Sequence, residues 1–157
     1  MEKVPMTREG LAQLEDELRR LRTEERPAVI RAIADAREHG DISENAEYHA
    51  ARERQSFIEG RLVELEDIIS RAQVIDTSGL SGDVVRFGAT VLLCDEDTEE
   101  ESRYTLVGSH EADAANGRLS VTSPLGRALI GKRLGDIVEV TAPRGSRSYE
   151  VVQIAYA

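Results

Sequence analysis

The sequence is poor in the residues that usually build a ligand pocket or a cross-linked fold. Its 157 residues include one cysteine, no tryptophan and only 4% aromatic side chains. The single cysteine, Cys94, excludes an internal disulfide and fits a reducing compartment. No run approaches the roughly 20 apolar residues of a membrane-spanning helix. The opening residues MEKVPMTREG also lack the apolar region of a secretory signal. We therefore expect a cytoplasmic protein without membrane association.

Basic charge is scarce as well. There are 20 lysines and arginines against 30 aspartates and glutamates, which gives a net charge of -10. This balance argues against a general duplex-DNA binder, which would carry a basic face to neutralise phosphates. It leaves room for a small basic patch or a basic partner. The 40% hydrophobic and 32% charged composition is typical of a folded globular protein rather than a disordered one.

The pattern of apolar residues changes near DTSGLSGD, residues 76–83. Before this segment the periodicity is helical, and after it short β-branched runs alternate between glycines. The sequence therefore predicts a helical domain over residues 1–76, a linker over 77–83 and an α+β domain over 84–157. In the last of these we expect paired strands around an acidic loop at 95–101, a third strand, a short helix and a closing hairpin. The acidic loop has no calcium-loop spacing and is interpreted as a solvated hairpin end.

Apolar residues spaced by three and four predict a coiled-coil seam along both halves of the helical region. The second half carries Tyr48, Ala51, Gln55, Ile58, Leu62, Leu65, Ile69 and Ala72. The first half carries Leu11, Leu14, Leu18 and Leu21, and then, shifted by one position, Val29, Ile33 and Ala36. Pro27 lies in the shift and is expected to bend or interrupt the first helix. Two arms of about 30 residues, each about 45 Å long, cover their seams by folding antiparallel into a rod.

The turn of this hairpin, within the tip at residues 38–47, contains few apolar side chains. Gly40 can end the first helix, and Asp41 with Glu44 matches a capping box for the second. Counting the seam backwards from Tyr48 by four and then three also reaches Glu44 and Asp41. Two interpretations stay open at this point. The acids are a helix cap, or they are a convergent, exposed pair at the end of the rod.

Three segments carry a family resemblance that spans essentially the whole chain. They are MTREGLAQLEDEL, ADAREHGDISENAEYHAARERQSFIEGR and SPLGRALIGKRLGD. The sequence resembles the GreA group of the GreA/GreB family, which are bacterial transcript-cleavage factors. The resemblance implies an α+β protein in which an N-terminal antiparallel coiled-coil hairpin is followed by a small FKBP-like domain.

The resemblance also implies a function. Such a factor rescues backtracked bacterial RNA polymerase: its globular domain docks at the rim of the secondary channel, and its coiled coil reaches the active centre. Asp41 and Glu44 occupy the family's acidic tip positions, where they help hold a second Mg²⁺ of the polymerase and orient a water that cuts the nascent RNA near its 3′ end. No intrinsic metal or cofactor is expected, the chain is not an enzyme by itself, and we expect it to act as a monomer.

Further contacts are implied residue by residue. Arg37 and Arg52 match the family's basic spot for the extruded RNA, and Arg54 matches it less closely. Unaided by the family, these arginines would be interpreted as ordinary partners of nearby glutamates. The small size of the basic area indicates the GreA branch rather than the more basic GreB branch.

His39 and His49 lack zinc-site spacing, so no metal role is assigned to them.

Polymerase docking is expected around the SP segment, at Ser123, Pro124 and Leu125. Ser123 and Pro124 equally suit the start of a helix.

Three alternative functions are kept. An inhibitory paralogue would occupy the channel without stimulating cleavage, but the chain retains both tip acids. A prolyl isomerase would use the FKBP-like fold, but the domain offers few aromatic walls and fold is a weak guide to activity. A plain coiled-coil adaptor would explain the rod, but it would not explain why acidic residues continue the seam beyond the part that the partner helix covers.

Overall fold

The computed structural model describes residues 2–77 and 80–156. They form two compact units: one consists chiefly of Leu11–Ala72, and the other combines Val4–Gly10 with the chain from Gln73 onward. The sequence placed everything before residue 77 in the helical domain, whereas the structure groups Val4–Gly10 with the second unit.

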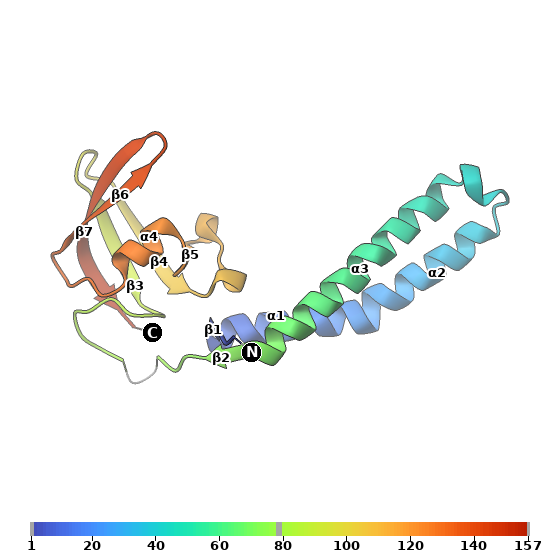
Figure 1. Cartoon of the computed structure of the whole chain (residues 1–157), viewed down its shortest axis with the longest axis horizontal. Helices are drawn as coiled ribbons and strands as arrows, with labels where there is room; N and C mark the ends of the chain where they lie inside the picture. The colour runs from blue at the N-terminus through green and yellow to red at the C-terminus, as the bar shows by residue number, and fades with distance from the viewer. Residues whose placement is uncertain (1, 78–79, 157) are drawn as a thin grey trace. The chain divides into compact units, whose positions relative to one another are not determined.

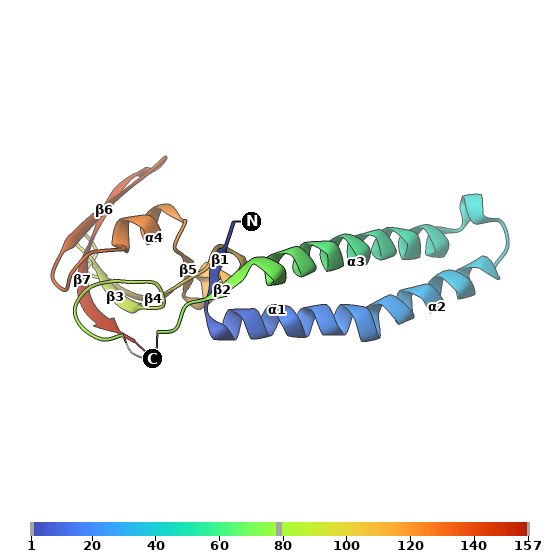
Figure 2. The same cartoon turned by 60° about the horizontal axis from the view of Figure 1, so that its bottom comes forward.

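The first unit is an antiparallel helical hairpin. Its first arm contains α1 (Arg8–Arg20), a π-helical turn η1 (Leu21–Glu25) and α2 (Arg26–Arg37), and its second arm is α3 (Ala46–Arg71). Figures 1 and 2 show α3 running alongside the first arm. The buried seam consists of Leu14, Val29, Ile33, Ala36, Ile58, Leu62, Leu65 and Ile68. The fold class expected for this region is therefore confirmed.

The first arm passes Pro27 without a break. Leu21 and Val29 lie eight positions apart, one more than the seven of a regular seam repeat. A π-turn takes up one extra residue, and η1 lies immediately before the helix in which Pro27 occupies an early position. The shift in the seam is thus absorbed by the π-turn, so the regular α-helix is interrupted just before Pro27 while the arm itself continues.

The far end of the seam also differs from the prediction. Ile68 is 2% exposed, whereas Ile69 is only half-buried. Ala72 does not continue the helical seam, because it begins the short strand β2 (Ala72–Val74), which pairs with β1 (Val4–Met6). A straight helix drifts relative to a strict heptad, and spacing alone did not resolve which of two adjacent isoleucines faces inward.

The second unit contains a five-stranded sheet and one short helix. Its elements are β3 (Thr90–Asp95), β4 (Glu101–Val107), β5 (Arg118–Ser120), α4 (Pro124–Leu129), β6 (Ile137–Ala142) and β7 (Gly145–Ala155). The sheet order is β5-β4-β3-β7-β6, with β4 and β5 parallel and the other neighbours antiparallel. These elements are the ones predicted, and they confirm the α+β class.

The core of this unit lies where α4 meets the sheet. Alternate residues of β3 are buried, as expected of a strand with one covered face. Leu129 of α4 is fully buried in the same cluster as Val91, Leu93 and Val151. Gly126 lets α4 approach closely, because a Cβ there would lie 2.0 Å from the Ser120 carbonyl oxygen.

Two buried carboxylates stabilise the second unit through hydrogen bonds. Glu111 accepts bonds from Thr7 N at 3.0 Å, Thr7 Oγ1 at 2.8 Å and Gly108 N at 2.9 Å. These bonds attach the Val4–Gly10 segment to the second unit, which explains its grouping there. Asp95 caps the acidic loop by accepting from Asp97 N and Thr98 N, and it is also bonded to Arg147. The rest of that loop is exposed, as predicted.

Candidate functional site: the acidic tip of the hairpin

The tip is built from two short turns between α2 and α3. The last residue of α2 is Arg37, and Gly40 has a φ of 107°, a conformation that favours glycine. A single 3-10 turn, η2 (Ile42–Glu44), follows before α3 begins at Ala46. The predicted position of the turn and the role of Gly40 therefore agree with the structure.

The cap of the second arm is Asn45, not Asp41. Asn45 Oδ1 accepts a hydrogen bond from Tyr48 N at 3.0 Å. Asp41 caps only the 3-10 turn, and its Oδ1 accepts from both Ser43 N at 3.0 Å and Ser43 Oγ at 2.9 Å. The predicted capping box is therefore wrong. The backward extension of the seam is wrong for the same reason, because the extended backbone at Asn45 interrupts the helical periodicity.

Asp41 and Glu44 nevertheless converge. Both side chains are exposed, and both line one open depression of about 470 Å³ at the tip, together with His39, Asn45, Ala46 and Glu47. The hydrogen bonds to Asp41 all fall on Oδ1. Within the described ranges no hydrogen bond or ion pair engages Asp41 Oδ2 or the Glu44 carboxylate. The tip thus presents acceptor oxygens that none of the described residues engages.

The charge on Asp41 is stabilised locally. The backbone N–H of Ser43, and then its hydroxyl, lower the pKa of Asp41 from its ordinary value by hydrogen bonding to the charged form. Another carboxylate, Glu47, faces His39 with 3.8 Å between Oε2 and Nε2. The arrangement is an anionic rim around a shallow depression, which suits an incoming cation.

The three arginines near the tip differ in what they contact. Arg37 lies over the Tyr48 ring, with its guanidinium carbon 5.8 Å from the ring centroid. Arg52 is exposed and, in the part of the chain that the structure describes, has no ion pair. Arg54 is ion-paired with Glu25 of the opposite arm. Arg37 and Arg52 are therefore the guanidinium groups left available beside the acids.

The tip alone provides too few ligands for a divalent cation. Over residues 2–77 and 80–156 there is no cluster of three or more His, Cys, Asp or Glu side chains suited to a metal. Mg²⁺ requires six oxygen ligands and usually takes one or two carboxylates together with phosphates and waters. Two tip carboxylates are therefore too few to hold Mg²⁺ by themselves.

Comparison with known proteins agrees with this architecture along its whole length. Residues 4–74 match the family model for the N-terminal region of transcription elongation factors, and residues 80–156 match that for the GreA/GreB C-terminal region. The chain belongs to the GreA/GreB family of transcription elongation factors.

Individual relatives give the same assignment. The chain is 66% identical to transcription elongation factor GreA of Rhodospirillum rubrum and 64% identical to that of Phenylobacterium zucineum. Each comparison covers 99% of both chains. Among solved structures, the GreA factor homolog 1 (Gfh1) protein of Thermus thermophilus is 32% identical over 98% of this chain and 99% of its own, with a TM-score of 0.44.

The three residues that the GreA/GreB resemblance suggests for docking lie at the start of α4. The Ser123 hydroxyl accepts from Gly126 N at 3.0 Å and donates to the Ser120 carbonyl at 2.7 Å, so it is used as the helix cap. Pro124 is exposed, and Leu125 borders an open groove of about 700 Å³ whose apolar walls include Val140 and Tyr149. Pro124 is thus the exposed member of this set, whereas Leu125 is half-buried against the core and contributes to the wall of the groove.

No described helix is long and apolar enough to cross a membrane.

The sequence pattern predicted Asp41 as the cap of α3, whereas Asn45 is the residue that caps this helix in the structure. Its sequence signal was present, since asparagine is among the preferred N-cap residues. The sequence did not favour Asn45 over Asp41, because the Asp-x-x-Glu spacing of Asp41 and Glu44 fits a capping box equally well.

Proposed function

We propose that this elongation factor enters the secondary channel of bacterial RNA polymerase and stimulates the polymerase's own cleavage of backtracked nascent RNA. The partners are the polymerase, at the channel rim and active centre, and the 3′ end of the RNA. The chain acts as a monomer in the cytoplasm, where its polymerase resides, and has no catalytic activity of its own. The proposal rests on family membership together with the geometry of the tip.

The observation that carries the proposal is the free oxygen set of Asp41 and Glu44. Several carboxylates of the hairpin are bonded to arginines, whereas these two lie on one depression with Asp41 Oδ2 and both Glu44 oxygens unused in the described structure. A cap would need only one of them, and Asn45 already caps α3. The acids are therefore available for a cation that arrives with another molecule.

The chemistry follows from what the residues can bind. Asp41 and Glu44 would contribute carboxylate oxygens to a Mg²⁺ whose remaining ligands come from polymerase acids, RNA phosphate and water. That ion would be the second Mg²⁺ of the polymerase active centre, and it would supply charge stabilisation at the scissile phosphate, as in other two-metal sites. The bonds from Ser43 to Asp41 Oδ1 orient that carboxylate and leave Oδ2 for the cation.

Flanking groups complete the proposed contacts. Arg37 and Arg52 would contact the phosphates of the extruded RNA, since neither is ion-paired within the described residues. Pro124 and Leu125 would dock the second unit on the polymerase, with Leu125 beside an apolar groove. Ser123 would act indirectly, by capping the helix that presents them.

The test uses a backtracked elongation complex with 5′-labelled RNA and Mg²⁺. Wild-type chain is compared with Asp41→Asn and Glu44→Gln, after circular dichroism and competition binding have verified helicity and polymerase affinity. We expect wild type to shorten the RNA, and both variants to bind equally well without doing so.

Other outcomes identify the alternatives. If wild type binds and the RNA keeps its full length, the chain is an inhibitory occupant of the channel. If all three proteins stimulate cleavage equally, the tip acids have no part in the reaction. A prolyl isomerase would instead turn over proline-containing tetrapeptides in the absence of polymerase.

A further inference from the structure

The Asn45 side chain connects the two arms of the hairpin at the base of the tip. Its Oδ1 accepts from Tyr48 N in the first turn of α3 at 3.0 Å, and its Nδ2 donates to the Ala36 carbonyl near the end of α2 at 2.6 Å. The Ala36 carbonyl also accepts from His39 N at 3.1 Å. One half-buried amide therefore satisfies both a helix N-terminus and a helix C-terminus, which otherwise have unpaired backbone groups.

Few side chains have the chemistry for this double contact. A carboxylate of the same length can accept from Tyr48 N but cannot donate to Ala36. A serine can accept as a cap, but its shorter side chain does not carry a separate donor at the amide position. The contact to Ala36 is thus a specific addition to ordinary capping.

The segment between the two anchors carries the tip acids. Residues 38–45 connect α2, which ends at Arg37, to α3, which begins at Ala46, and Asp41 and Glu44 lie inside this segment. Its internal hydrogen bonds are few: Asp41 with Ser43 and Asn45 N with the Ile42 carbonyl at 3.2 Å. Asn45 closes this loop at its base and so limits how far the two carboxylates can separate.

We propose that Asn45 is a positioning residue that holds Asp41 and Glu44 as a preformed pair of Mg²⁺ ligands. It acts through the Nδ2 bond to Ala36 and does not itself contact the metal. This inference rests on the proposed function for its consequence in cleavage, but the structural step can be measured in the isolated chain. Preorganised ligands lose less freedom when the cation binds, so the effect appears in the Mg²⁺ dependence.

The decisive variant is Asn45→Ser, which retains a cap for α3 and removes the bond to Ala36. Asn45→Ala removes both contacts. Thr23→Ala serves as a matched control, because it removes a side-chain bond to a helical carbonyl, that of Arg19, away from the tip. All three are compared with wild type in hydrogen exchange of the isolated chain and in Mg²⁺ titrations of transcript cleavage.

In hydrogen exchange we expect Asn45→Ser to accelerate the His39 and Ser43 amides about 5-fold, the factor for losing one typical hydrogen bond. Amides of α3 beyond its first turn keep their rates. Thr23→Ala leaves the tip amides unchanged. Equal exchange rates of the tip amides in wild type and Asn45→Ser would show that the Asn45 side chain does not join the two arms in solution, whatever the polymerase assay shows.

In the cleavage assay we expect Asn45→Ser to bind polymerase normally and to need about 10-fold more Mg²⁺ for half-maximal stimulation, as for other residues that orient metal ligands. If Asn45→Ser had the same Mg²⁺ dependence as wild type, Asn45 would act only as a helix cap and not as a positioning residue. Failure of wild type itself to stimulate cleavage would instead refute the proposed function. The exchange data would still decide whether Asn45 joins the two arms.

Discussion

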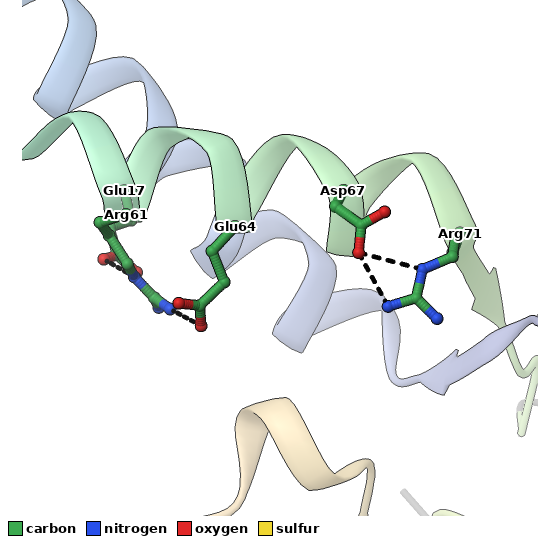
Figure 3. Close-up of polar contacts among 5 residues, drawn as sticks. All are labelled: Glu17, Arg61, Glu64, Asp67 and Arg71. Atoms are coloured by element: carbon green, nitrogen blue, oxygen red, sulfur yellow. Dashed lines mark hydrogen bonds and ion pairs between the residues drawn. The ribbon is translucent and has the colours of Figure 1, made fainter.

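The shaft of the helical hairpin, meaning its two arms at residues 8–37 and 48–71, has cross-arm ion pairs that its tip at residues 38–47 lacks among the described residues. Along the shaft, ion pairs cross between the arms: Arg61 with Glu17, Arg26 with Glu59, Arg22 with Glu66 and Arg54 with Glu25. Figure 3 shows Arg61 between Glu17 of one arm and Glu64 of its own, and Arg71 bonded to Asp67. At the tip, the acids and two of the arginines are left without such partners in the described structure.

The comparison separates charges that serve the fold from charges available for function. A carboxylate bonded to an arginine on both oxygens, as Glu17 is by Arg61 at 2.8 and 2.9 Å, has little left to offer a cation. Among the described residues, Glu44 has no hydrogen bond or ion pair of this kind. Composition cannot distinguish the two, because both are glutamates on or beside exposed helical segments. Four predictions test whether the distinction is real.

The largest effect is expected from neutralising one acid in each region. Glu44→Gln should lower stimulated cleavage more than about 100-fold, since a direct ligand should matter more than outer groups, which are often worth 10- to 100-fold. Its thermal unfolding should match wild type. Glu17→Gln should behave in the opposite way, with a lower Tm and normal cleavage. Similar cleavage by both variants would break the comparison.

The arginines give a smaller contrast. Arg52→Ala should reduce cleavage at limiting factor concentration about 5-fold, because it removes an exposed charged contact to RNA. Arg54→Ala, whose side chain is already paired with Glu25, should leave cleavage nearly unchanged. Rates would be measured in the same backtracked complex. An equal loss in both variants would mean that ion pairing does not decide which arginine reaches RNA.

Ion pairs of the shaft should contribute modestly to stability. Arg61→Ala removes a bidentate contact between the arms, and we expect about 1 kcal/mol less free energy of unfolding, near the upper end for partly exposed pairs. Urea denaturation of the whole chain measures this change. The difference from wild type should shrink in high salt, and a difference that salt leaves constant would point to lost packing of the arginine stem.

The smallest effect concerns the titration of Asp41. Because Ser43 lowers the pKa of Asp41, its contribution to folding is present above the unfolded pKa and is lost as pH falls through the lower folded pKa. Ser43→Ala removes the hydroxyl bond and keeps the backbone bond, so the pKa should rise part of the way towards its ordinary value. Carboxyl NMR titration of the two proteins tests this. An unchanged pKa would show that the hydroxyl does not bind Asp41 in solution.

Much of the architecture was predictable because its signals are local. Apolar spacing predicted both arms, and β-branched runs with glycines predicted the strands and the short helix of the second unit. The π-turn was visible only as a seam shifted by one position before Val29. The grouping of Val4–Gly10 with the second unit was not predictable, because it depends on Glu111 bonding to Thr7 far away in sequence. A Cβ on Gly10 would lie 1.3 Å from Glu111 Oε2, which explains that glycine only in retrospect.

The candidate site, too, was predictable from the sequence only in part. By itself, the sequence determined that a coiled-coil hairpin ends in an acidic turn carrying Asp41 and Glu44, since periodicity and glycine preferences act over a few residues. The tertiary structure decided which charges pair across the hairpin, because such a salt bridge requires that two side chains from opposite arms come within reach. It also decided that Asn45, rather than Asp41, caps α3 and joins the arms, since the carbonyl of Ala36 comes within 2.6 Å of its amide only after the hairpin has closed.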